Sequence, residues 1–530
     1  MDHEPRGRPN HVPVRVAPAA IRRALDTVAG RGIAFAALFA VAAAIQIYLV
    51  RPLDGPAAPD AAASVLYFQR IVAGRHLEAF VNTTPKPLLT LVYGLLFSAT
   101  HNWQLVSLGT AAAGAAAAVL GAELARRLGG LAAFAFAFVA LAGLQSLLRE
   151  VSWAYGLPWA VALWFATALA LVRERPHYGL AGFFLLLAGL ARPETFIVLG
   201  VATLTIGMAW LRDRPAARAA LPVLVGWLAL VGMGIHDWLL IGDPLWWTTV
   251  AAAHAAATPG QRTSVGGVLR EAFDRARALG LTSVLAVVGT AVLFRRRSWV
   301  ALVGLVALGP LIVVEDLFFA WRGLEVLTHY LDSIDVVAVL AAAVAVGAGV
   351  DVVTAAVRKR TPAFVDAAGP AAIVAAAVVA ALVTPFAPLS SGARAGIGRQ
   401  AELALNERRV LPALECAIGG HGGGAACAVA PGPDRLQLFL PSLQLAMLMV
   451  DLDIPVTRAT VLDKSRLRQD GTYPPPNSLV YLDNDADLAD LEEASAWLRV
   501  TSPIDVRNVH LVPLLADPAA GLWVVRVDPR

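Results

Sequence analysis

Long apolar runs recur along the first three quarters of the chain, and they restrict its fold more than any other feature. Each run holds about 15 to 23 residues, the length that an α-helix needs to cross the hydrocarbon core of a bilayer. The first run covers residues 32–50 and follows an arginine-rich tail. Further spans are predicted at 103–125, 128–148, 156–172, 178–191, 195–211, 219–241, 280–294, 298–317, 333–353 and 368–386. The sequence therefore predicts a polytopic α-helical membrane protein with about eleven transmembrane helices.

Composition and charge agree with this interpretation. The 530 residues are 58% hydrophobic and 15% charged, which is more apolar surface than a soluble fold can bury. Basic clusters lie in alternate connections between the runs, at Arg126/Arg127, Arg173/Arg175, Arg212/Arg214, Arg295/Arg296/Arg297 and Arg358/Lys359/Arg360. Because such clusters mark the cytoplasmic ends of membrane helices, the N-terminus is expected inside and the C-terminus outside. The net charge of +4 is thus an orientation signal and no sign of nucleic-acid binding.

The chain divides into three parts. Residues 1–31 form a cytoplasmic tail, 32–388 a membrane domain with a first outer loop at 51–102, and 389–530 an outer domain of soluble composition. The apolar stretch 88–99 is short for a crossing, and we interpret it as re-entrant or interfacial. Alternating patterns predict that the outer domain is a small α/β domain. Its strands are expected at 436–440, 456–462, 479–482, 509–514 and 522–527, and a helix at 488–498.

Ionisable side chains gather at the outer ends of the predicted spans and are nearly absent from their middles. Polar groups supplied by many helices at one membrane face predict a cavity there. The absence of charges at mid-membrane disfavours an ion or proton pathway, and no internal repeat of the kind found in many transporters is visible.

The first outer loop carries a candidate base and a candidate cation for a phosphate group. Asp54 and Asp60 precede an amphipathic helix, and Lys86 follows it within Pro85-Lys86-Pro87. A carboxylate at the lipid–water boundary can take a proton from an attacking hydroxyl. Lys86 and Arg192 are placed on the side where they could hold a phosphate leaving group.

The order of these motifs resembles the GT-C superfamily of polyprenyl-phosphate-sugar glycosyltransferases. The resemblance covers about residues 30 to 340, and its motifs, besides those of the first loop, are Gly189-Leu-Ala-Arg192-Pro193-Glu194, Gly242-Asp243-Pro244-Leu245 and His329-Tyr330-Leu331. It implies that Asp60 is the catalytic base, with Asp54 as the alternative. Glu150 stands where many members have a second Asp, and His329-Tyr330 with Arg322 stands where many have an Arg-Tyr pair. The substrate-binding residues are then expected to be Lys86, Arg192, Glu194, Arg322, His329 and Tyr330.

Simpler structural roles compete with these assignments. Asp60 could only cap its helix, and Lys86 could only extend to the membrane interface. Arg192 and Glu194 could form an ion pair at a hairpin tip, Glu150 could pair with Arg149 at the surface, and Asp243 lies in an ordinary turn sequence. His329 and Tyr330 could belong to an interfacial belt.

The two cysteines, Cys416 and Cys427, enclose a glycine-rich loop in the outer domain. A disulfide is expected there because the outer compartment is oxidising, and a metal site that includes His421 is the alternative.

The resemblance implies a multi-pass enzyme of a bacterial cytoplasmic membrane that transfers a sugar, with inversion, from a polyprenyl-phosphate donor to a glycan, lipid or protein acceptor of the cell envelope. High alanine, glycine, proline and arginine content favours a bacterial source. No cofactor is called for by the sequence, although a divalent cation could assist the leaving phosphate. The alternatives are a lipid or polysaccharide transporter or flippase, and an accessory protein that keeps the fold without catalysis.

Overall fold

The structure is a computed structural model of the whole chain. Its helical part is described for residues 28–50, 59–77, 86–213, 217–249, 264–322, 331–360 and 365–386. Its C-terminal part is described for residues 406, 409–418, 436–440, 445–452, 459–461, 474–483, 498–499, 501–506, 509–519 and 522–530.

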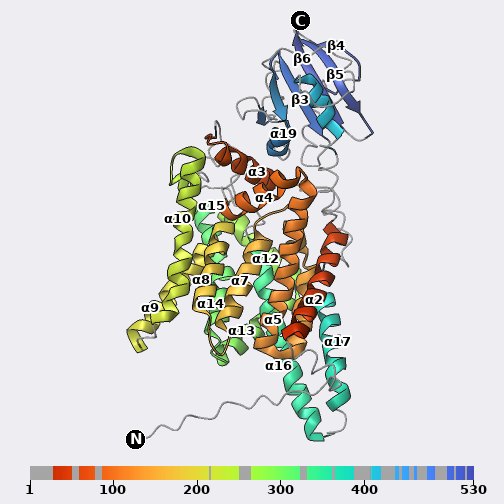
Figure 1. Cartoon of the computed structure of the whole chain (residues 1–530). Coiled ribbons are helices and arrows are strands. Elements are labelled where there is room, and N and C mark those ends of the chain that lie inside the picture. The colour runs from red at the N-terminus through yellow and green to blue at the C-terminus, as the bar shows by residue number, and fades with distance from the viewer. Residues whose placement is uncertain are drawn as a thin grey trace.

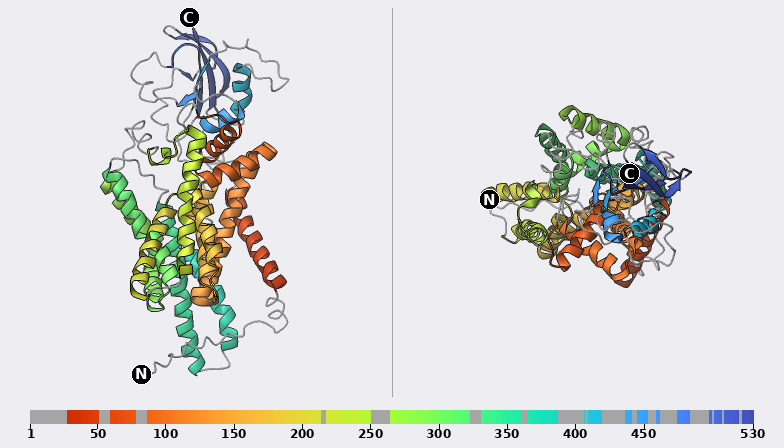
Figure 2. Two further views of the ribbon diagram at one scale, coloured as in Figure 1. Left: turned by 60° about the vertical axis from the view of Figure 1, so that its left-hand side comes forward. Right: turned by 90° about the horizontal axis from the view of Figure 1, so that it is seen from above.

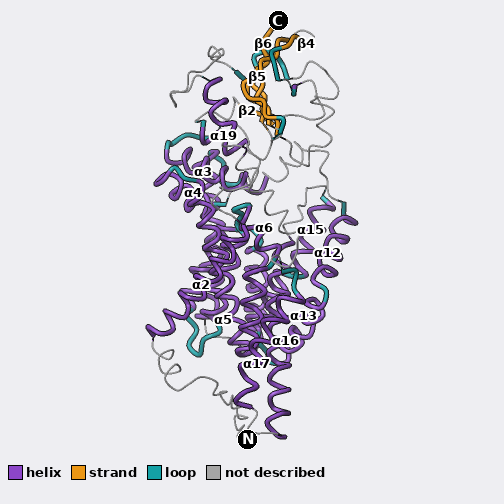
Figure 3. The backbone as a smooth tube through the Cα atoms, turned by 90° about the vertical axis from the view of Figure 1, so that its right-hand side faces the viewer, coloured by secondary structure: helices purple, strands orange, loops and turns teal. Residues whose placement is uncertain are grey.

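An elongated bundle of helices carries a small β-sheet at one end, which we call the sheet end (Figure 1). The helices are α2 (Val28–Val50), α3 (Pro59–Val72), α4 (Pro87–Thr100), α5 (Trp103–Gly143), α6 (Gln145–Ser152), α7 (Leu157–Leu171), α8 (Tyr178–Ala191), α9 (Thr195–Asp213), α10 (Leu221–Ile241), α12 (Val265–Leu279), α13 (Leu281–Arg295), α14 (Trp299–Leu308), α15 (Pro310–Trp321), α16 (Asp332–Arg360), α17 (Val365–Val383) and α19 (Leu445–Asp451). Among the residues that the structure describes, the strands all lie in the C-terminal part (Figure 3). The predicted fold class, a helical membrane protein with a small C-terminal α/β domain, is confirmed.

The chain is a multi-pass membrane protein. Among the described helices, five are long and apolar enough to cross a membrane, or six if the bent pair α12–α13 counts as one span. Shorter apolar helices, α4, α7, α8, α9 and the last part of α17, pack among them. The predicted total of about eleven crossings and the direction in which the bundle faces stay predictions.

Helix α5 is a folded-back pair of helices. Its 41 residues would span about 60 Å if straight, twice the thickness of a bilayer core. The chain reverses at Gly130, whose φ of 82° is a left-handed value that glycine adopts without strain. A Cβ atom placed on Gly121 would lie 2.5 Å from Cδ1 of Leu141, which a straight helix excludes. The two predicted spans 103–125 and 128–148 correspond to these two arms.

Other helices depart from the prediction in two places. The run 298–317 is interrupted at Gly309 and Pro310 between α14 and α15, because proline removes a helical hydrogen bond and fits best in a first turn. The two helices together still form one apolar segment long enough to cross a membrane, Trp299–Trp321. Helix α12 was not predicted, since its arginines and acidic residues hide an amphipathic pattern. It joins α13 at a bend of 92°.

The C-terminal sheet has six strands in the order β2-β1-β3-β6-β5-β4. These are β1 (Gln437–Leu440), β2 (Ala459–Val461), β3 (Ser478–Asp483), β4 (Ile504–Val506), β5 (Val509–Asp517) and β6 (Leu522–Pro529). Strand β1 is parallel to β2 and β3, and the other pairs are antiparallel. The predicted helix 488–498 lies almost wholly outside the described residues.

The sheet domain rests on the bundle through α3, which α19 contacts. One hydrophobic cluster includes Val65 and Tyr67 of α3, Leu448 of α19 and Leu479 of β3. The indole of Trp103, at the start of α5, donates a hydrogen bond of 2.9 Å to the carboxylate of Asp451. The views in Figure 2 show the sheet above the end of the bundle that carries α3 and α4, so the C-terminal domain covers the helices of the first loop.

A candidate active site at the sheet end of the bundle

The first loop brings Asp60 and Lys86 together. Asp60 lies in the first turn of α3, where a carboxylate is favoured by the helix dipole. Lys86 immediately precedes Pro87, which begins α4. The ammonium group of Lys86 contacts the carboxylate of Asp60 directly, and each side chain is 14% exposed. The predicted base and the predicted phosphate contact are therefore neighbours that water can still reach.

Arg192 forms the centre of a second, deeper cluster. It follows α8, and its Nη1 lies 3.0 Å from Oε2 of Glu150 while its Nε lies 2.6 Å from Oε1 of Glu194. Glu150 is fully buried and Arg192 is 5% exposed. Burial raises the pKa of the Glu150 carboxyl, and the guanidinium of Arg192 opposes that shift. The pair of Arg192 with Glu194 forms as the sequence suggested, whereas Glu150 bonds Arg192 instead of its chain neighbour Arg149.

The turn between α6 and α7 separates these two clusters and touches both. Lys86 Nζ lies 5.8 Å from the ring centre of Tyr155. A Cβ atom on Gly156 would lie 2.7 Å from the carbonyl oxygen of Ala191 and 3.5 Å from Cδ of Lys86. Gly156 thus lies between Lys86 and the C-terminal end of α8, which Arg192 directly follows. Ala154, just before, has φ of 52°, a strained value for a residue with a side chain.

Two buried carboxylate oxygens of this site lack a hydrogen-bond donor. Within the described part of the chain, Oε1 of Glu150 and Oε2 of Glu194 have no hydrogen-bond partner. Buried carboxylate oxygens are costly to leave unsatisfied, and sugar hydroxyls are donors of the right kind to satisfy them. The arrangement offers a partly exposed carboxylate and ammonium group and, deeper, two carboxylate oxygens that can still accept hydrogen bonds.

A third group of charges borders the site, and sequence reasoning did not assign it. Asp332, at the start of α16, lies 2.6 Å from both Arg149 of α6 and Arg275 of α12, and Arg275 also reaches Asp335 at 3.3 Å. Asp332 is one of the ionisable residues that the sequence predicts at the outer helix ends, so its location could be predicted. Its partner Arg275 could not be found because α12 itself was not predicted.

Helix α4, which Lys86 precedes, is held by a second buried network. Nε2 of His236 lies 3.1 Å from the hydroxyl of Thr90, and its Nδ1 lies 3.1 Å from Asp237. Asp237 also accepts a hydrogen bond of 2.7 Å from the backbone N–H of Trp247. These contacts tie α4 to α10 and so fix the position of Lys86.

Several predicted residues lie elsewhere. Arg322 is exposed at the end of α15. Asp54, His329, Tyr330 and Cys427 lie outside the described residues. Cys416 is disulfide-bonded, and Cys427 is the only other cysteine of the chain. Among the described residues no three His, Cys, Asp or Glu side chains are grouped so that they could hold a metal ion.

The structure of the chain was compared with those of known proteins. No family model and no curated protein matches the sequence. A crystal structure of ArnT from Cupriavidus metallidurans bound to undecaprenyl phosphate aligns with 94% of this chain and 98% of its own, at a TM-score of 0.52 and 14% identity. The apo structure of the same protein aligns with 93% and 98%, at 0.49 and 15%. The chain has the fold of this ArnT structure.

The predicted resemblance is therefore confirmed at the level of fold. The likeness runs through the bundle and the C-terminal domain, since the alignment covers nearly all of both chains. At this sequence identity the GT-C fold alone does not assign an activity, so the site residues must carry the functional argument.

Proposed function

We propose that the chain is a glycosyltransferase that moves a sugar from a polyprenyl-phosphate donor to an acceptor at the sheet end, on the extracytoplasmic face. The observation that supports this most directly is the contact between Asp60 and Lys86, at the rim of a site bordered by buried carboxylates. The ArnT structure with the same fold was solved bound to undecaprenyl phosphate, and it supports a lipid phosphate as the donor carrier.

The chemistry assigns one task to each residue. The acceptor hydroxyl attacks the anomeric carbon, the bond from that carbon to the phosphate oxygen breaks, and the hydroxyl proton passes to Asp60. Lys86 compensates the charge of the departing polyprenyl phosphate. A single displacement of this kind inverts the anomeric centre. A divalent cation bound to the phosphate would share in compensating its charge.

The Asp60–Lys86 contact gives the site a means of coupling donor binding to the release of the base. While Lys86 contacts Asp60, its ammonium group occupies a carboxylate oxygen that would otherwise accept the proton. A donor phosphate competes for the same ammonium, so donor binding releases Asp60 for proton transfer. Arg192 is already bound by Glu150 and Glu194, and we assign it to holding these carboxylates toward the sugar.

Sugar transfer from radiolabelled decaprenyl- and undecaprenyl-phosphate sugars tests the proposal directly. We expect wild-type membranes to transfer label from at least one donor, and Asp60→Asn to lower the rate by about a thousandfold. Asp243→Asn is the matched control, since it removes the same charge from an exposed turn at the same end, where Asn keeps the bond to the N–H of Leu245.

Two results would contradict parts of this assignment. Full activity of Asp60→Asn, with expression matched, would move the base to Asp54 or Glu150. Failure of the wild type with every donor would favour a transporter or a non-catalytic accessory protein.

A further inference from the structure

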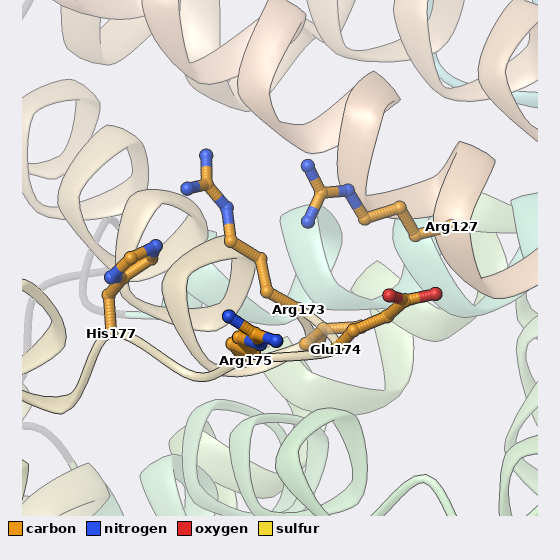
Figure 4. A pocket seen from close by; sticks show the side chains of 6 residues that line it. Arg127, Arg173, Glu174, Arg175 and His177 are labelled. Carbon is orange, nitrogen blue, oxygen red and sulfur yellow. The ribbon is translucent and has the colours of Figure 1, made fainter.

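A basic pocket lies far from the candidate active site, at the end of the bundle opposite the sheet. Its volume is about 660 Å³, and it is lined by Arg127, Val172, Arg173, Glu174, Arg175 and His177. Arg127 comes from α5 and the others from the segment that joins α7 to α8 (Figure 4). Two parts of the chain that are distant in sequence thus form one concave, positively charged surface.

The walls of this pocket are fixed by hydrogen bonds. Arg127 donates from Nη1 to the carbonyl oxygen of Leu169 at 3.3 Å, and its Nε lies 3.0 Å from Glu123. The backbone N–H of His177 bonds the carbonyl of Ala170 at 3.0 Å and closes the connecting segment back onto α7. The pocket is therefore a defined feature of the bundle end and not merely a loose run of basic residues.

The charges in the pocket are not balanced within the protein. Among the described residues, neither Arg173 nor Arg175 has an ion-pair partner, although Glu174 lies between them in sequence. Arg127 is paired with Glu123, so the unbalanced positive charge of the pocket is that of Arg173 and Arg175. Membrane proteins place arginine at this kind of end for orientation, but orientation alone does not require the arginines to converge on a pocket.

Helix α8 begins directly after His177, at the edge of the pocket. His177 is the N-cap residue of α8, its side chain makes no capping hydrogen bond, and the first turn holds no acidic residue. The first N–H groups of a helix have no partner within the helix, and together with its dipole they favour an anion. No heavy atom lies within 4 Å of a Cβ built on Gly179, so a ligand can approach this turn.

We infer that this pocket binds the phosphate group of an anionic ligand. Arginine pairs with phosphate through paired, charge-assisted hydrogen bonds, and basic pockets between membrane helices bind phospholipid headgroups. An anionic phospholipid of the adjoining leaflet and a soluble phosphate compound share this chemistry. The site is independent of the proposed sugar transfer, which takes place at the sheet end.

Thermal unfolding of the purified full-length protein in neutral detergent can separate the two sources. Dioctanoyl phosphatidylglycerol, dioctanoyl phosphatidylcholine and glycerol phosphate would be titrated in parallel. Stabilisation by phosphatidylglycerol but not by phosphatidylcholine or glycerol phosphate identifies a lipid headgroup, and stabilisation by glycerol phosphate as well identifies a soluble phosphate compound.

Paired substitutions tie the effect to the pocket. Arg173→Gln with Arg175→Gln should weaken the apparent affinity by about tenfold or more. Arg295→Gln with Arg297→Gln removes the same charge from an exposed turn at the same end and should leave the affinity unchanged. Equal weakening in both double variants would show general surface attraction and overturn the proposal, as would stabilisation by none of the compounds.

Discussion

The two ends of the bundle use positive charge in opposite ways. At the sheet end, Lys86, Arg149, Arg192 and Arg275 each contact a carboxylate from another helix or turn, and Arg192 is 5% exposed. At the other end, Arg173 and Arg175 are exposed and have no ion-pair partner among the described residues. Burying a charge costs desolvation energy, so a buried cation is stable only where a carboxylate is held in the right position beside it. The exposed ones are free for ligands or for membrane orientation.

The largest expected difference between the ends is in stability. Arg192→Gln should lower the free energy of unfolding by about 3–5 kcal/mol, because Glu150 and Glu194 would stay buried without their cation. Arg126→Gln breaks a pair with Glu123 in which the arginine is 46% exposed, and it should cost at most about 1 kcal/mol. Unfolding of both variants in detergent measures the contrast. Equal losses in the free energy of unfolding would mean that the buried ion pairs of Arg192 stabilise the protein no more than the exposed pair of Arg126.

Donor binding gives the next contrast. Lys86→Gln should raise the KM for the lipid-linked donor by about thirtyfold with a smaller change in kcat, because it removes a charge-assisted contact to the phosphate. Arg75→Gln removes a cation from an exposed position just after α3 and should leave both constants unchanged. A fall in kcat alone would mean that Lys86 acts only on the departing phosphate and adds nothing to donor binding.

Adding a methyl group to Gly156 tests how tightly the turn between α6 and α7 is packed. Gly156→Ala should destabilise the protein by about 1–3 kcal/mol, because the new Cβ would lie 2.7 Å from the carbonyl of Ala191. Transfer should slow as well, since this turn separates Lys86 from Arg192. Gly200→Ala on α9, where a Cβ meets nothing within 4 Å, should be neutral or slightly stabilising. Unfolding and transfer rates of the two variants decide the point.

The smallest expected effect concerns the attachment of the sheet. Trp103→Phe removes the indole donor to Asp451 and should cost about 1 kcal/mol, the net worth of one hydrogen bond. Trp210→Phe on α9, where the indole is 57% exposed, serves as the control in the same unfolding measurement. An unchanged stability of Trp103→Phe would show that apolar contacts alone hold the domain.

Sequence reasoning located the apolar helices well because length and composition suffice for them. The expected span 178–191 and helix α8 have the same ends, and α13 and α16 begin within a residue of their predicted starts. Helix α12 escaped because its charged face lowers its hydropathy. The strands β1, β3, β5 and β6 followed from alternation, whereas β4 has only three residues and gives no periodic signal.

The site was predictable as a set of residues but not as a set of pairs. The order of motifs singled out Asp60, Lys86, Glu150, Arg192 and Glu194. That Asp60 meets Lys86 and that Glu150 meets Arg192 depends on how α3, α4, α6 and α8 pack, which local pattern does not encode. The bonds of Asp332 to Arg149 and Arg275 depend further on α12.

The packing of α3 beneath α19 has a consequence for biosynthesis. Ribosomes make the helix that carries Asp60 long before Leu448 and Leu479, which complete its buried face. Contacts between such distant parts of a chain form late in folding. The first loop therefore reaches its final position only after Leu448 and Leu479 have left the ribosome, so a product truncated before them would be inserted in the membrane without a finished active site.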